Sequence, residues 1–186
     1  MNLLIIAIIL AAIPLINWLA EYYFSKKDKQ LTLFKKHFTC FYTDLILIPF
    51  NFFAAFAINL SSIYLLGIII LAILSALILY PYWARVHKKE NNPIFMFNAK
   101  TQKVSKAGIS HFIFQIIETI IVFSFLFSSL VNIFSYLASA FLLVFILLLL
   151  VGSRKIHKKF ILSDVFFVAF STILLVIRVL RPILLS

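Results

Sequence analysis

The sequence is poor in glycine, cysteine and acidic residues, and each shortage removes a class of function. It contains 3 Gly, 1 Cys and 6 Asp or Glu among 186 residues. With Cys40 as the one cysteine, the chain can form neither an internal disulfide nor a cysteine metal site. A Gly-rich phosphate loop and the GxSxG, HExxH and CxxC motifs are also missing. We therefore predict no catalytic residue, no cofactor and no bound metal, and the balance is against an enzyme.

Apolar residues are what the chain has in abundance. They make up 64% of the sequence, with 22 Phe and a mean hydropathy of +1.12, whereas soluble domains contain about 45–50%. Six apolar stretches approach the ~20 residues that a helix needs to cross a bilayer. We predict an all-α fold: one integral membrane domain, a polytopic bundle of about six transmembrane helices. The predicted spans are residues 3–20, 42–60, 62–84, 109–130, 133–151 and 160–180.

Basic residues are concentrated between these apolar stretches. Fifteen of the 17 Lys and Arg fall within residues 26–36, 85–106 and 154–159. Cytoplasmic loops of membrane proteins retain Lys and Arg. We therefore predict cytoplasmic basic loops at 22–41, 85–108 and 152–159, with both termini outside and the first span as an uncleaved anchor. The predicted location is the inner (plasma) membrane.

The net charge of +11 favours an anionic partner, which can be of two kinds. Basic patches can track the phosphates of nucleic acid, but no nucleic-acid-binding motif is present. Because the charge follows the edges of apolar runs, the anionic headgroups of the inner leaflet fit better. We predict a lipid bilayer as the partner and no nucleic acid. The predicted headgroup contacts are Arg85, Lys88, Lys89, Arg154, Lys155 and His157.

Polar residues inside the spans are the best guide to function, because they are costly in hydrocarbon and usually face the bundle interior. At 100° per residue, polar residues share a face in spans 42–60, 109–130 and 160–180. The last of these faces also carries Ser171 and Arg178. We predict that these three helices line a common interior. The candidates for an ion, proton or polar-network site are Asp44, Asn51, His111, Gln115, Glu118 and Asp164.

Glu118 is the deepest of these candidates. At 1.5 Å of rise per residue from Ile109, it lies roughly 14 Å into a hydrocarbon core of about 30 Å. A carboxylate at that depth must be paired, hydrated or protonated. His111 and Gln115 are expected nearer the cytoplasm, with Asp44 and Asp164 at the same entrance. Two interpretations stay open: an acid–imidazole path for protons or cations, and a structural network around a protonated Glu118.

The order of elements from residue 35 to about 168 resembles that of RDD-family membrane proteins. In that family a basic residue opens a helix that carries an Asp, as in "KKHFTCFYTDLILIP" with Asp44. "NAKTQKVSKAGISHF" stands where the family's loop meets a helical hairpin, and "SRKIHKKFILSDVFFV" matches the closing segment at His157. Lys158 replaces the family's aspartate, and the loop's Gly-Lys is absent. The resemblance implies transport of ions or small solutes and nominates Asp44 and His157.

Three functions follow as alternatives. A non-catalytic membrane subunit or accessory protein, held in a membrane-protein complex or a homo-oligomer, is favoured by the short outer loops and the lack of chemical motifs. The second is a small transporter-like protein for ions, protons or solutes that uses Asp44, His111, Glu118 and Asp164. The third is a lipid-modifying enzyme whose basic loops hold headgroups.

Overall fold

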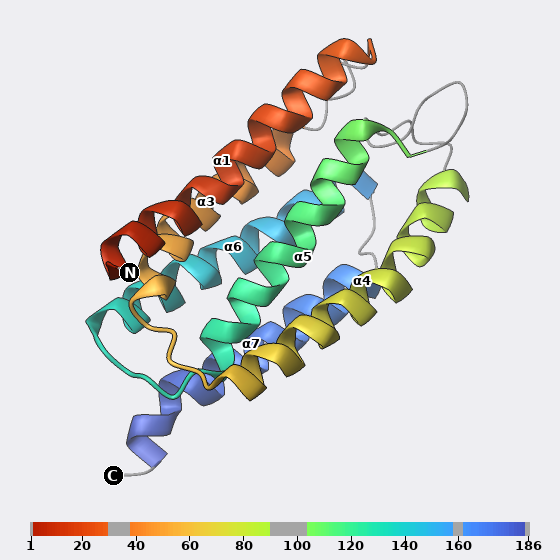
Figure 1. The fold of residues 1–186 in the computed structure, drawn as a ribbon. Helices are drawn as coiled ribbons and strands as arrows, with labels where there is room; N and C mark the ends of the chain where they lie inside the picture. The colour runs from red at the N-terminus through yellow and green to blue at the C-terminus, as the bar shows by residue number, and fades with distance from the viewer. Residues whose placement is uncertain (1, 30–37, 90–103, 158–161, 185–186) are drawn as a thin grey trace.

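The computed structural model describes residues 2–29, 38–89, 104–157 and 162–184, and these form six helices (Figure 1). The all-α prediction is confirmed. The side chains of 38–43, 79–80, 82–89, 153, 155–157, 162–164 and 182–184 lie outside the description. The helices are α1 (Leu3–Lys27), α3 (Phe38–Ala55), α4 (Ser62–Lys89), α5 (Lys106–Phe127), α6 (Ile133–His157) and α7 (Leu162–Leu184).

Three of the helices are long and apolar enough to cross a membrane. They are α1, α5 and the Ile133–Gly152 part of α6. Each exceeds 18 residues with few charges, which is the length that a hydrocarbon core demands. The protein is therefore a membrane protein by the length and composition of its helices.

Caps, rather than hydropathy, set the helix ends. α1 continues past Ala20 to Lys27, where the Asp28 amide donates to the Phe24 carbonyl and Lys29 takes a left-handed φ of 57°. α5 begins at Lys106 because the Ser105 hydroxyl accepts a hydrogen bond from the Gly108 amide at 3.0 Å. α3 ends at Ala55, earlier than the expected Leu60. α1 and α5 thus extend beyond their apolar spans, and Glu21 lies in the extended part of α1.

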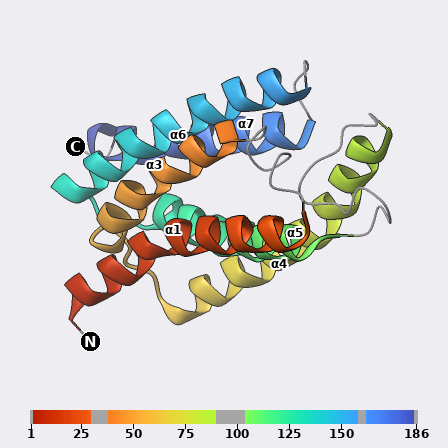
Figure 2. The ribbon, with the colours of Figure 1, turned by 90° about the horizontal axis from the view of Figure 1, so that it is seen from above.

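The helices form a closed ring with one helix outside it. α1 packs against α3, α3 against α6, α6 against α7, α7 against α5, and α5 back against α1. α4 packs mainly against the outside of α5. Figure 2 shows this arrangement from above, with α3 between α1 and α6. α3 and α5 also touch, so polar residues of α1, α3 and α5 can meet.

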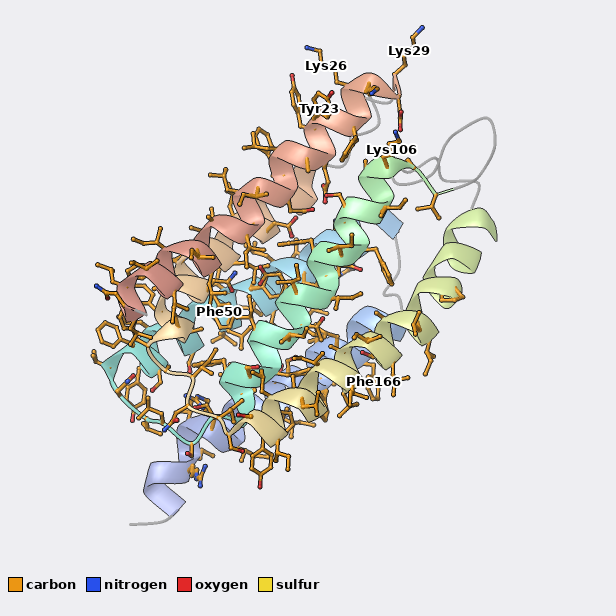
Figure 3. All side chains as sticks on the ribbon, viewed as in Figure 1. Tyr23, Lys26, Lys29, Phe50, Lys106 and Phe166 are labelled. Carbon is orange, nitrogen blue, oxygen red and sulfur yellow. The ribbon has the colours of Figure 1, made fainter. Side chains whose placement is uncertain are left out.

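Phenylalanine fills much of the space between the helices. Phe50 is fully buried in the middle of the bundle (Figure 3) and meets Phe125 edge to face, with 5.5 Å between ring centroids. Phe53 stacks on Phe141 at 5.8 Å and on Phe134 at 6.3 Å, which joins α3 to α6. Such ring pairs add to the burial of apolar area. This packing holds the polar side chains described below in place.

Candidate functional site

A polar contact between three helices is built around Pro14 of α1. Proline has no amide hydrogen, so the Leu10 carbonyl, one turn earlier, lacks its helical donor. Asn51 of α3 is fully buried, and its Nδ2 donates to this carbonyl at 3.1 Å. The same Nδ2 donates to Oε1 of Glu118 on α5 at 2.8 Å. One amide therefore satisfies a carbonyl freed by proline and holds a carboxylate that is 6% exposed.

A second polar contact joins α1 to α5 nearer the lysine-bearing helix ends. Oε1 of Glu21 accepts hydrogen bonds from Asn17 Nδ2 at 2.6 Å and lies 2.8 Å from His111 Nδ1. The Ser110 hydroxyl donates to Asn17 Oδ1 at 3.1 Å. The Glu21 and His111 side chains are 6% and 12% exposed. A carboxylate–imidazole hydrogen bond this short and this well shielded from water is stronger than one between neutral groups.

The other ring nitrogen of His111 contacts Gln115, and the orientation of the Gln115 amide depends on the protonation state of the ring. His111 Nε2 lies 2.9 Å from Nε2 of Gln115. When the Gln115 amide donates here, the imidazole is neutral with its hydrogen on Nδ1, facing an ionised Glu21. A doubly protonated imidazole requires Gln115 to turn its oxygen toward the ring. His111 can therefore gain or lose a proton at the cost of one amide rotation.

Asp44 adds a third carboxylate to the group. It is half-buried on α3 and interacts electrostatically with His111, Glu21 and Glu118. We call Glu21, Asp44, His111 and Glu118 the acidic cluster. Among the side chains that the structure describes, no three His, Cys, Asp or Glu are grouped so that they could hold a metal ion. The cluster combines three acids with one imidazole, so its formal charge is negative unless protons or cations join it.

Of the six residues predicted to contact headgroups, the structure describes the side chain of Arg154. Arg154 is exposed on α6. The other five lie near the C-terminal ends of α4 and α6, and the site candidate Asp164 lies at the start of α7. The side chains of all six are outside the described part of the chain. They are Arg85, Lys88, Lys89, Lys155, His157 and Asp164.

A buried arginine occupies the opposite end of α5. Arg178 of α7 is 5% exposed, and its guanidinium carbon lies 4.1 Å from the centroid of the Phe125 ring. Its nitrogens donate to the main-chain carbonyls of Ser128, Leu130 (2.7 Å) and Ala57 (3.4 Å). These carbonyls follow the C-termini of α3 and α5, which carry partial negative charge. We call this arrangement the arginine clasp.

The clasp is reinforced by side chains of the two turns that it joins. Ser128 Oγ donates to the Ala57 carbonyl at 2.9 Å and accepts from the Asn59 amide at 2.9 Å. Asn132 Nδ2 donates to the Phe56 carbonyl at 2.9 Å. The turn after α3 and the turn after α5 are therefore tied together with Arg178 between them.

No protein-family model, curated protein or solved structure matches the chain. The RDD resemblance stays a prediction, and the function must be inferred from the geometry of the site.

Sequence reasoning missed the contribution of α1. Hydropathy places the end of the first span at Ala20, which leaves Glu21 outside it, yet Glu21 is buried and pairs with His111. A signal was present: Pro14, Asn17, Glu21 and Ser25 recur every three or four residues, and all four are buried. Arg178 of α7 lies at the far end of the bundle. Among the described side chains, those of the cluster come from α1, α3 and α5.

Proposed function

We propose that this chain is a small multi-pass membrane protein that binds and transfers protons or small cations at the acidic cluster. The observation that carries the proposal is the gathering of Glu21 and Asp44 around His111, with Glu118 within electrostatic range of Asp44. Two of the three helices involved, α1 and α5, are apolar enough to cross a bilayer. Ionised groups of like charge repel strongly where the local dielectric is low. Protons or cations must therefore enter the cluster, and ionisable residues within a membrane usually mark such a path.

The hydrogen bonds supply an order for proton movement. Glu21 and His111 share one hydrogen bond and exchange a proton directly. Gln115 lies between His111 and Glu118 on one face of α5, one turn from each, and its amide can turn with the charge of His111. His111 and Glu118 are about 10 Å apart along the helix axis, so transfer between them uses Asp44, a titratable group that interacts with both.

The proposal includes six crossings with both termini outside and the basic helix ends in the cytoplasm. Lys26, Lys29 and Lys106 gather at one end of the bundle (Figure 3). The pair of Glu21 and His111 lies toward this end, because Lys26 follows Glu21 on α1 and Lys106 precedes His111 on α5. The arginine clasp lies at the other end. The cluster would therefore open to the cytoplasm, while the clasp closes the outer side.

Proton flux into liposomes tests the proposal. The purified full-length protein would be reconstituted with a pH-sensitive dye inside, and a potassium gradient with valinomycin would drive proton entry. We expect flux above that of protein-free liposomes, and its loss in His111→Gln and Glu21→Gln. Asp28→Asn is the matched control, because Asp28 lies past the end of the same helix and outside the cluster. Wild-type flux equal to that of empty liposomes would refute the proposal.

A non-catalytic membrane subunit is the second candidate, and the exposure of α4 favours it. Ile63, Tyr64 and Ile78 of α4 are 77%, 68% and 71% exposed, and the helix packs mainly against α5. A partner helix, or a second copy of the chain, could cover this apolar face within the bilayer. Extraction in a mild detergent and measurement of molecular mass test it. A stoichiometric partner or a dimer supports this function, and a monomer contradicts it.

A further inference from the structure

The contact between Asn51 and Glu118 leaves two buried oxygens without a partner. Asn51 has two amide hydrogens, and it uses them for the Leu10 carbonyl and for Oε1 of Glu118. Oε2 of Glu118 and Oδ1 of Asn51 are both buried and accept no hydrogen bond from any described residue. Buried polar atoms nearly always have a partner. A donor or a positive charge is therefore missing from this contact.

A proton on Glu118 is one way to supply what is missing. It neutralises the charge and turns Oε2 into a donor, which Oδ1 of Asn51 can accept while Nδ2 still donates to Oε1. Asn51 cannot rotate its amide to offer Oδ1 in place of Nδ2, because its oxygen would then face the Leu10 carbonyl, and two acceptors repel. The freed carbonyl behind Pro14 thus fixes the orientation of the amide. When Glu118 is ionised, both oxygens are left without a partner among the described residues.

A cation is the other way to satisfy both oxygens, and it does so when Glu118 is ionised. We propose that Asn51 and Glu118 form a binding site for a small monovalent cation, with sodium as the probe, and that the cation competes there with one proton. This inference rests on the proposed function and names the ion that its deeper site takes. The two side chains touch through Nδ2 and Oε1 at 2.8 Å, and in the proposed site one cation with its water bridges the two free oxygens.

The chemistry of the site favours a hard, singly charged ion. A carboxylate oxygen and an amide oxygen are hard ligands, and carbonyls released where a membrane helix is interrupted commonly coordinate sodium. The Leu10 carbonyl is released in this way by Pro14 and retains a second lone pair. One carboxylate balances one positive charge. Asp44 is the titratable group within electrostatic range of Glu118 from another helix, and its negative charge also attracts a cation.

The exchange balances without any further reactant. Protonated Glu118 and a sodium ion become ionised Glu118 with bound sodium and one released proton. The site is separate from the pair of Glu21 and His111. In that pair, Oε1 of Glu21 and both ring nitrogens of His111 already have hydrogen-bond partners. The protein would then hold a proton at one site and exchange a proton for a cation at the other.

Release of protons on addition of salt tests the inference. The full-length protein in detergent would be held in weakly buffered solution while sodium chloride is added, with choline chloride at equal ionic strength as the reference. We expect release of about one proton per protein with sodium and none with choline. Glu118→Gln should abolish the release, and Asp28→Asn should leave it unchanged. Equal release from Glu118→Gln and wild type would overturn the inference.

A titration of the unaltered protein guards against variants that do not fold. If one proton competes with one cation, the sodium concentration at half-saturation rises about tenfold for each unit of lower pH, in the range where Glu118 is protonated. A half-saturation independent of pH, or no response to sodium, would overturn the inference. Proton flux in liposomes that persists without any sodium response would leave the proposed function standing. Loss of both would remove the proposed function as well.

Discussion

Replacing Asn51 with Leu should destabilise the protein through the carbonyl that Pro14 frees. An ordinary hydrogen bond between membrane helices contributes about 0.6 kcal/mol, because polar groups find other partners. The Leu10 carbonyl has no alternative, since residue 14 lacks an amide hydrogen. A buried acceptor left without a donor costs about 1–3 kcal/mol, and Glu118 also loses its one donor. We expect Asn51→Leu to lower the free energy of unfolding by about 2–4 kcal/mol.

A double-mutant cycle separates this cause from general loss of packing. Pro14→Ala restores a helical donor to the Leu10 carbonyl, so Asn51→Leu should cost about 1 kcal/mol less in that background. Pro81→Ala is the matched control, because Pro81 interrupts α4 away from Asn51. The free energy of unfolding would be measured by detergent denaturation of each variant. A coupling of zero with Pro14→Ala, or an equal coupling with Pro81→Ala, would refute the reasoning.

Two further predictions concern the arginine clasp and the sidedness of the chain. Arg178→Leu removes the donor to three main-chain carbonyls and should lower the free energy of unfolding by about 2–4 kcal/mol. Arg181→Leu, at an exposed position, should change it by less than about 0.5 kcal/mol; equal effects in the same denaturation assay would contradict the burial argument. In a cysteine-free background, Lys29→Cys and Lys106→Cys should be protected from an impermeant thiol reagent added outside cells, whereas Ser61→Cys should react. Labelling of Lys29→Cys and Lys106→Cys from opposite sides would show that the predicted topology is wrong.

The contact between Asn51 and Glu118 shows which part of the site can be predicted from the sequence pattern. Both residues were candidates because a polar residue within an apolar span usually faces other helices. The heptad spacing of His111, Gln115 and Glu118 also placed them on one face of a helix. The structure adds the contact itself, and the reason for it: a carbonyl freed by Pro14 on a third helix. Periodicity within one helix carries no information about which other helix supplies a partner.

The sequence alone determined that the chain is an all-α membrane protein, because hydropathy and helix length are properties of each segment taken separately. Its lysines and arginines likewise predicted one basic side. Only the tertiary structure decided that α1 meets α3 and α5 at the acidic cluster, and that Arg178 ties two turns together instead of facing lipid. The physical reason is that lipid-facing and core-facing surfaces are equally apolar in a membrane helix. Packing between helices therefore determines the partners of Glu21 and Arg178, and the sequence of a single helix does not predict that packing.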